Sequence, residues 1–348
     1  MSHVLDSILE TVGETPMVAL HNVVKGSKHK FFAKIEYFNP GGSIKDRVAV
    51  KIIEEAEKRG ELKPGGTIVE ATSGNTGVGL ALAAAVKGYK CIIVMPQKMS
   101  EEKRALLRAY GAQVVITPMV DPDHPMSHYN VSKRIVAEIP GGFLANQFFN
   151  PDNVAQHYQT TGPEVWKQMD GKIDMLVAGA GTGGTLSGCA QYLKEHKPSV
   201  KVVCADPVGS ILYDLYYHKK IVDPPGSYKV EGIGEDMLPG NVHLEKYDGF
   251  VRVNDQEAFD MTRRLVAEEG LLVGPSSATA LVGAIKFSEK FETPLNIVVV
   301  FADSGRQYLS KAFNDQWMVE NGLLKEEQIK DSFNRVISAE EALKQYSK

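Results

Sequence analysis

A lysine placed where a glycine turn leads into a helix is the first residue of this sequence that could act as a nucleophile. Lys45 lies in FNPGGSIKDR (38–47), two residues after Ser43, which could cap the helix. The positive end of a helix dipole lowers the pKa of an ammonium group, and a lysine with a lowered pKa can form a Schiff base at neutral pH. An ordinary solvated lysine explains this segment alone equally well.

Two further strand-to-helix turns carry groups that bind anions. In EATSGNTGVG (70–79), hydroxyls, an amide and free backbone N–H groups meet at a helix N-terminus, which suits a carboxylate, whereas a simple helix cap would explain only one of these residues. In MLVAGAGTGGTLSG (175–188), N–H groups and hydroxyls predict a phosphate cradle before a helix that begins near Gly183. The residues concerned are Thr72, Ser73, Asn75 and Thr76 in the first turn, and Gly181, Thr182, Gly183, Gly184 and Thr185 in the second.

The second turn also fits a dinucleotide-binding fingerprint. Gly179, Gly181 and Gly184 match G-x-G-x-x-G, and Asp206 ends the next predicted strand at about the offset of a ribose-binding acid. A nicotinamide- or flavin-dependent oxidoreductase is therefore an alternative, although it leaves Lys45 and the TSGNT turn without a role.

A fourth junction between a loop and a helix lies in GLLVGPSSATALVGA (270–284). Ser276 could cap this helix, or it could donate a hydrogen bond to a ring nitrogen of a cofactor. A neutral serine leaves such a nitrogen unprotonated and makes the ring a weaker electron sink than an aspartate would. That property favours elimination and replacement at Cβ over transamination.

Short apolar, β-branched runs alternate with amphipathic segments along the chain, which predicts an α/β protein with mostly parallel sheets. Glycines that close the amphipathic segments are helix stops. The predicted strands are 31–36, 67–72, 91–96, 113–118, 174–180, 201–207 and 296–303, and clear helical patterns cover 47–60, 75–88 and 255–270.

Two domains fit this alternation better than one. We expect one domain at 37–150 and a larger one made of 1–36 and 151–348. The family resemblance given below implies that the smaller domain is mobile and clamps the substrate and that the larger one binds the cofactor phosphate. The final stretch from Leu323 predicts a surface helix.

Composition narrows the function further. The 348 residues are 43% hydrophobic and 24% charged with a net charge of -4, which indicates a globular protein without a nucleic-acid partner. No apolar run predicts a membrane span, and the first residues do not resemble a signal peptide, so we expect a cytoplasmic protein. We expect Cys91, Cys189 and Cys204 to be buried reduced thiols, and DPDHPMSH (121–128) to be a loop, not a metal site.

The order GGSIKDR, TSGNTG, GTGGT and GPSS resembles the fold-type-II pyridoxal-phosphate family of cysteine synthases and cystathionine β-synthases, from about Asp6 to Trp317. The resemblance implies a tryptophan-synthase-β-like fold of two three-layer α/β domains, with pyridoxal 5'-phosphate as the cofactor. It implies Lys45 as the Schiff-base lysine, Asn75 on the ring hydroxyl, Ser276 on the pyridine nitrogen and residues 181–185 on the phosphate. It also implies that Thr72, Ser73, Thr76 and Gln147 hold the substrate carboxylate.

Within this family, VEGIGEDMLP (230–239) and FADSGRQYLSKAFNDQWM (301–318) are similar to the cystathionine β-synthase branch, and Tyr158 takes the place of an active-site tyrosine of that branch. Glu235 stands where haem-bearing members have tyrosine. The branch implies a homodimer that replaces the hydroxyl of L-serine by the thiol of L-homocysteine, with hydrogen sulfide as a side product.

From where the sequence begins and ends we expect no haem and no activation by S-adenosylmethionine. A cysteine synthase that uses O-acetylserine and sulfide is the nearest alternative, because NPDNVAQHYQTTGPEVW (150–166) resembles those enzymes as well. A non-catalytic scaffold on this fold is a third alternative, although it requires none of Lys45, Asn75 and Ser276.

Overall fold

A computed structural model of the protein describes residues 4–72, 74–97, 101–121, 123–330 and 337–347. The chain forms two compact units, Met1–Gln307 and Tyr308–Lys348. The second unit contains the helices α11 (Asp315–Glu320), α12 (Glu326–Lys330) and α13 (Ala339–Tyr346). The last two lie in the tail for which the sequence predicts a surface helix.

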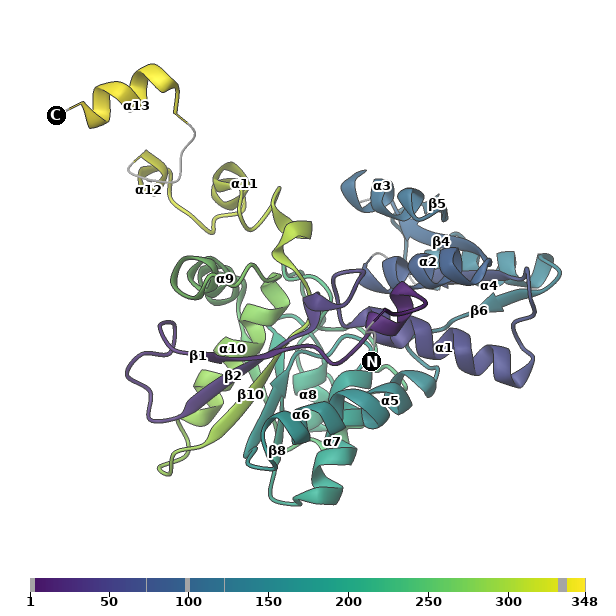
Figure 1. The fold of residues 1–348 in the computed structure, drawn as a ribbon, viewed down its shortest axis with the longest axis horizontal. Helices are drawn as coiled ribbons and strands as arrows, with labels where there is room; N and C mark the ends of the chain where they lie inside the picture. The colour runs from purple at the N-terminus through teal and green to yellow at the C-terminus, as the bar shows by residue number, and fades with distance from the viewer. Residues whose placement is uncertain (1–3, 73, 98–100, 122, 331–336, 348) are drawn as a thin grey trace. The chain divides into compact units, whose positions relative to one another are not determined.

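The strands of the first unit form two separate sheets (Figure 1). The larger sheet has the order β1-β2-β10-β7-β8-β9, and the smaller has the order β5-β4-β3-β6. Every pairing is parallel except that of β1 with β2. The strands are β1 (Met17–Leu20), β2 (Lys30–Ile35), β3 (Thr67–Ala71), β4 (Lys90–Pro96), β5 (Gln113–Thr117), β6 (Gly142–Leu144), β7 (Met175–Ala178), β8 (Lys201–Pro207), β9 (Gly249–Val253) and β10 (Asn296–Phe301).

Helices connect these parallel strands, as parallel pairing requires. The α-helices of the first unit are α1 (Lys45–Arg59), α2 (Asn75–Lys87), α3 (Glu101–Ala109), α4 (His128–Glu138), α5 (Asp152–Gln156), α6 (Gly162–Gln168), α7 (Gly184–His196), α8 (Leu212–His218), α9 (Asp255–Glu269) and α10 (Pro275–Ser288). Shorter turns are the 3₁₀ segments η1 (Ile8–Thr11), η2 (Glu36–Phe38), η4 (Leu244–Lys246) and η5 (Gly305–Tyr308), and the π-helical η3 (His157–Thr161).

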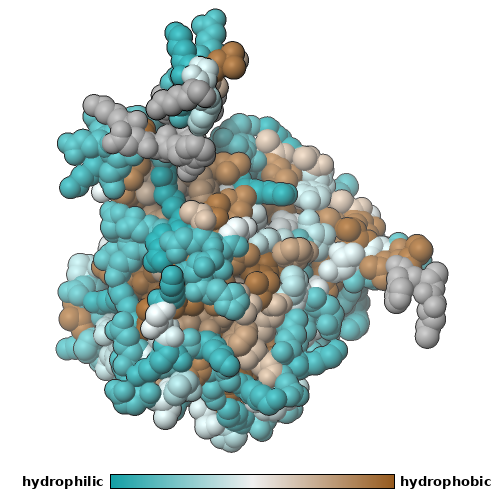
Figure 2. Space-filling model, turned by 60° about the vertical axis from the view of Figure 1, so that its left-hand side comes forward, coloured by the Kyte–Doolittle hydropathy of each residue, from teal (hydrophilic) through white to brown (hydrophobic). Residues whose placement is uncertain are grey.

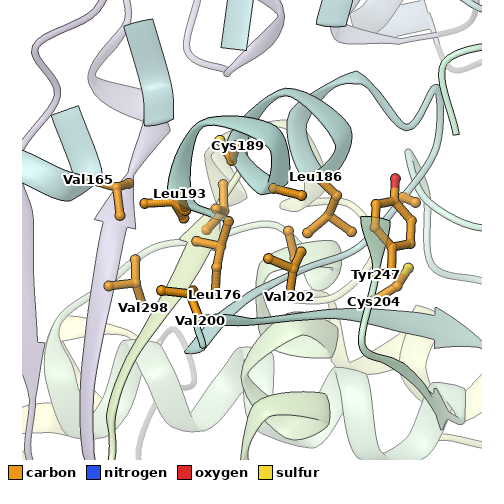
Figure 3. Packing of buried hydrophobic residues seen from close by; sticks show 14 of the residues in the cluster. Val165, Leu176, Leu186, Cys189, Leu193, Val200, Val202, Cys204, Tyr247 and Val298 are labelled. Atoms are coloured by element: carbon orange, nitrogen blue, oxygen red, sulfur yellow. The ribbon is translucent and has the colours of Figure 1, made fainter. Parts of the chain in front are cut away.

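Helices cover both faces of the larger sheet. On one face, Leu176 and Val202 pack against Leu186, Cys189 and Leu193 of α7, which recur at the spacing of one helix face (Figure 3). Figure 1 places α10 against the same strands from the other side, where a Cβ on Gly283 would lie 2.6 Å from Cβ of Ala205. Strands buried on both faces explain the continuous apolar runs of this sequence.

The smaller sheet is also the middle of three layers. Ile68 and Ile93 face the core that α1 and α2 complete, whereas Val69, Ile92 and Val94 face α4. Two three-layer α/β arrangements with mostly parallel sheets therefore confirm the predicted fold class.

Local sequence signals explain where the helices begin and end. Asn254 and Glu257 form a capping box at the start of α9. Gly60, Gly88 and Gly270 end α1, α2 and α9 in left-handed conformations. The predicted glycine stops are thus confirmed.

Burial and hydropathy agree with the composition. The three cysteines are buried and form no disulfide. Hydrophilic residues cover much of the face in Figure 2, and hydrophobic residues gather in smaller areas. Among the described residues, no helix is long and apolar enough to cross a bilayer, and no cluster of His, Cys, Asp and Glu could hold a metal ion.

Candidate active site

A pocket at the carboxyl ends of β7 and β10 brings together three of the four motifs that could carry chemistry. In parallel sheets ligands bind at this edge, because loops and helix N-termini converge there. The predicted residues that line the pocket are Lys45, Gly181, Thr182, Gly183, Thr185 and Ser276. Its wall is completed by residues between or beside them, among them Ile44, Ala178, Gly179, Gly232, Ile233 and Ala302.

Lys45 is the first residue of α1, and its backbone N–H donates to Ser43 Oγ over 3.2 Å. Burial lowers the pKa of Lys45, while the carboxylates of Asp303 and Glu235 oppose that shift. The lowering agrees with the sequence prediction, but its main cause is desolvation and not the helix dipole. Gly79 of α2 lets α1 approach closely, since a Cβ there would lie 3.0 Å from the carbonyl oxygen of Lys45.

Asp303, which belongs to none of the four sequence motifs, contacts three of the segments that form this site. Its side chain is buried and accepts a hydrogen bond from Asn75 Nδ2 over 2.8 Å. Its backbone bridges Ser43 and accepts from the N–H of Gly274, one residue before α10. Asp303 therefore fixes the lysine turn, the start of α2 and the start of α10 relative to one another.

The glycine-rich turn before α7 has little room for side chains. Gly183 is the N-cap residue at φ +87°, and a Cβ there would lie 2.3 Å from Cγ2 of Val242. A Cβ on Gly181 would lie 2.6 Å from the carbonyl oxygen of Gly232. Glycine keeps this turn narrow, so that its N–H groups and the hydroxyls of Thr182 and Thr185 remain directed at one anion.

His157 supports this turn, whereas Tyr158 does not. The buried ring of His157 lies with Nε2 3.2 Å from Thr185 Oγ1 and Nδ1 2.9 Å from Thr161 Oγ1. Burial, then the charges of Arg47 and Lys45, hold the pKa of His157 well below its usual value, so the ring is neutral.

The structure does not bring the predicted catalytic Tyr158 into the pocket. Its hydroxyl donates to Glu195 Oε2 over 2.8 Å on an exposed part of α7, and its ring packs edge-on against Tyr192. Successive residues of this π-helical turn point in different directions, so the side chains of His157 and Tyr158 do not face the same site. The expectation that Tyr158 points into the active site is therefore corrected: its side chain lies on the surface beside Glu195.

The residues predicted to hold a carboxylate form a second cluster beside the pocket. Thr76 Oγ1 donates to Gln147 Oε1, and both side chains are buried. Thr72 Oγ1 accepts from the N–H of Gly74, the N-cap residue of α2. Ser73 lies outside the described residues.

Gln147 also connects this cluster to the pocket. Asn153 Nδ2 donates to the carbonyl oxygen of Gln147 and to Thr182 Oγ1, each over 2.9 Å.

Two alternative readings of single residues can be decided from the geometry. Ser276 does not cap α10, because Gly274 is the N-cap residue and Pro275 opens the helix. Its hydroxyl has no hydrogen-bond partner among the described residues and lines the pocket. Asp206 is fully buried and accepts from the N–H of Tyr213 over 2.9 Å, so its carboxylate faces its own loop and not a ribose.

Comparisons with known proteins agree with this site. The family described as pyridoxal-phosphate dependent enzyme matches residues 8–303. The chain belongs to this family. A cystathionine β-synthase of Mus musculus is 47% identical over 93% of this chain and 58% of its own length. A cysteine synthase of Staphylococcus aureus is 42% identical over 88% of this chain and 96% of its own length.

Solved structures of the family agree as well. A hydrogen sulfide-producing enzyme from Fusobacterium nucleatum has a TM-score of 0.81 at 36% identity and covers 89% of this chain and 99% of its own. The resemblance to the fold-type-II pyridoxal-phosphate family, predicted from four motifs, is confirmed. The chain spans about three fifths of the length of the curated cystathionine β-synthases it matches, at 58–64%.

The described residues fit the cofactor of this family. Asn75 Oδ1 is buried without a hydrogen-bond partner, although its amide nitrogen is held by Asp303, so an acceptor is left for a ligand. Ser276 lines the pocket as well, and the narrow glycine turn offers donors to a phosphate. Lys45 completes the set as an amine with a lowered pKa.

Proposed function

We propose that this chain catalyses pyridoxal-phosphate-dependent β-replacement on L-serine, in which the hydroxyl is exchanged for the thiol of L-homocysteine to give L-cystathionine and water. The observation that carries the proposal is one pocket that Lys45, residues of the 181–185 turn and Ser276 line together. Relatives named cystathionine β-synthase, 42–47% identical over 91–94% of this chain, support the choice of reaction.

The cofactor roles follow from the donors and acceptors present. The 181–185 turn would hold the phosphate, Asn75 Oδ1 would accept a hydrogen bond from the ring hydroxyl, and Ser276 Oγ would donate one to the pyridine nitrogen. Bound pyridoxal phosphate withdraws electrons from Cα of an attached amino acid. A serine at the ring nitrogen limits that withdrawal, which favours loss of a group from Cβ.

Lys45 and the carboxylate cluster then act on the substrate. Thr72, Thr76 and Gln147, with Ser73, hold the serine carboxylate and so orient Cα toward Lys45. With its lowered pKa, Lys45 Nζ takes the Cα proton as general base and returns a proton to the departing hydroxyl oxygen.

We also propose that residues 37–150 form a domain that closes over the substrate. Support comes from contacts between the two layered arrangements that closure would remake. Lys103 of α3 pairs with Glu231, and Arg59 Nη2 of α1 lies 2.8 Å from Asp152 Oδ2. Closure would exclude water from the reaction. The family resemblance further supports a homodimer located in the cytoplasm. Light scattering on the purified protein tests whether the protein is a dimer.

Product analysis by mass spectrometry tests the reaction. The purified protein with its cofactor receives L-serine or O-acetylserine, each paired with homocysteine or sulfide. Cystathionine from serine and homocysteine as the fastest product supports the proposal. Cysteine from O-acetylserine and sulfide as the fastest product overturns it in favour of a cysteine synthase, which the 96% coverage of the Staphylococcus aureus enzyme makes the second candidate.

Substitution of the lysine tests its role. We expect Lys45→Ala to abolish turnover while the far-ultraviolet circular dichroism stays that of the parent. An exposed lysine near the other end of α1, Lys58, supplies the control, and Lys58→Ala should retain full activity. Retention of more than a trace of activity in Lys45→Ala would rule out this mechanism.

A further inference from the structure

Glu70 is a buried carboxylate inside an otherwise apolar strand. It lies in β3, opposite Ile93 of β4, and only 3% of it is exposed. No lysine, arginine or histidine of the described residues forms an ion pair with it. A buried carboxylate without a cation costs several kcal/mol unless hydrogen bonds satisfy it, so this residue needs a compensating role.

Its hydrogen bonds point to that role. Glu70 Oε2 accepts from the backbone N–H of Asn146 over 2.7 Å, and Oε1 accepts a longer bond of 3.4 Å from the N–H of Gln147. Asn146 has a φ of +52°, a left-handed conformation that asparagine adopts more readily than most residues other than glycine. This conformation turns two successive N–H groups toward the carboxyl group of Glu70. Glu70 thus satisfies the N–H groups of the turn that carries Gln147.

Gln147 connects the carboxylate cluster with the phosphate turn. Its side-chain oxygen accepts from Thr76 in the carboxylate cluster. Its carbonyl oxygen accepts from Asn153 and Asn241, each over 2.9 Å, and Asn153 also binds Thr182 of the phosphate turn. A displaced Gln147 would therefore disturb the carboxylate cluster first.

We propose that Glu70 is a positioning residue of the substrate site, which holds the Asn146–Gln147 turn and thereby places Gln147 beside Thr76 to receive the substrate carboxylate. This inference rests on the proposed role of that cluster. Glu70 touches neither substrate nor cofactor and acts through Gln147.

Because Glu70 lies behind the substrate site, its protonation state should affect substrate binding. Burial raises the pKa of Glu70 to about 8, although the N–H groups of Asn146 and Gln147 oppose that shift. Below that pH Glu70 is neutral, and above it a negative charge lies behind the site of an incoming carboxylate. Amino-acid binding should therefore weaken as the pH rises through about 8.

Three other titratable groups must be separated from Glu70 in this pH range. Cys91 of β4 and Tyr129 of α4 interact electrostatically with Glu70, and burial above all raises the pKa of both, to about 12 for Cys91. Both stay neutral between pH 7 and 9. Glu235 titrates near pH 8 by burial beside Asp236 and Asp206, but it is common to all the variants compared below.

Glycine titrations of the holoenzyme test the inference, with the absorbance of the bound cofactor as the signal. Glycine has a carboxylate but no leaving group, so its dissociation constant does not depend on the replacement reaction. The variants are Glu70→Ala, Glu70→Gln and the matched control Glu138→Gln, an exposed glutamate at the end of α4.

At pH 7 we expect Glu70→Ala to raise the glycine dissociation constant and the KM for serine about tenfold or more, with kcat changed less than about threefold. Glu70→Gln should restore both constants to within about threefold. From pH 7 to 9 the ratio of the wild-type to the Glu70→Gln dissociation constant should rise severalfold, whereas the ratio of wild type to Glu138→Gln stays constant.

The inference is overturned if the ratio of the wild-type to the Glu70→Gln glycine dissociation constant stays constant from pH 7 to 9. It is also overturned if Glu70→Ala binds glycine as tightly as the wild type. If the wild type makes no cystathionine but the glycine results hold, only the proposed reaction fails. If cystathionine forms but the variants bind glycine alike, only the role of Glu70 fails.

Discussion

The buried charge network around Arg47 permits a quantitative test of how the lysine helix is held. The Arg47 guanidinium binds Glu36 through Nε and Nη2, at 2.7 and 3.0 Å, and Glu164 through Nη1 and Nη2, at 2.6 and 2.7 Å. All three side chains are at most 6% exposed. The network joins α1, two residues after Lys45, to the end of β2 and to α6.

Replacement of Arg47 by methionine keeps the packing volume but removes the cation. Glu164 keeps Lys34, whose Nζ lies 2.6 Å away, so its charge remains compensated. Among the residues that the structure describes, Glu36 keeps two neutral side-chain donors, Thr15 Oγ1 and Asn39 Nδ2. Leaving one buried charge without its partner costs about 3–5 kcal/mol. For a chain of this size, about 2 °C per kcal/mol predicts a fall in melting temperature of roughly 6–10 °C.

Scanning calorimetry of the apoprotein measures this effect, because cofactor binding would add its own stabilisation. Glu36→Gln in the Arg47→Met background neutralises the orphaned carboxylate and should recover part of the loss. Arg264→Met, which breaks an exposed pair with Glu268, is the control and should leave the melting temperature nearly unchanged. A fall for Arg47→Met as small as that of Arg264→Met would refute the reasoning.

Two further predictions concern the larger sheet. Leu176→Ala removes a fully buried side chain between β7 and α7 and should lower the unfolding free energy by about 2–5 kcal/mol in urea denaturation, whereas Val86→Ala, at an exposed position, should change it by less than about 0.5 kcal/mol. Burial raises the pKa of Asp206 to about 7. Its neutral form thus stabilises the fold below about pH 4, and that contribution is lost as the pH rises through 7. Asp206→Asn should reduce the fall in melting temperature between pH 5 and 8, and a slope equal to that of the wild type would count against this assignment.

The predicted strands are confirmed. β5, an edge strand in which only Thr117 is buried, is marked by its β-branched residues, whereas most of the others are buried on both faces. Such strands carry continuous apolar runs, which a single sequence displays without any knowledge of neighbours. The strands that the sequence analysis missed lack this signal. β6 has three residues, β1 is an antiparallel edge strand with alternating burial, and β9 is an edge strand that carries Arg252. The domain boundaries at 37 and 150 stay a prediction.

The turn motifs of the site could also be predicted, because they use backbone N–H groups and local hydroxyls. Lys45 and the 181–185 turn need only a strand, a turn and a helix to face a ligand, and both contribute residues to the pocket. Asp303 and Glu70 contact segments 29–260 residues away, at spacings that follow no local pattern, and only the folded chain brings them there. The sequence holds one sign of each residue. Asp303 is a polar residue at the end of a predicted buried strand, and Glu70 is the one carboxylate within another.

Which of the two side chains, His157 or Tyr158, points toward the phosphate turn depends on how one helical turn is rotated. The residue types alone do not determine that rotation. The segment from His157 to Thr161 is π-helical, and Gly188 of α7 packs so closely that a Cβ would lie 2.7 Å from the backbone nitrogen of Tyr158. A wider turn shifts the direction of every following side chain relative to a regular α-helix. Here it directs the imidazole at Thr185 and the phenol at Glu195. Sequence similarity can therefore place this segment beside the phosphate turn without fixing which of its side chains points toward that turn.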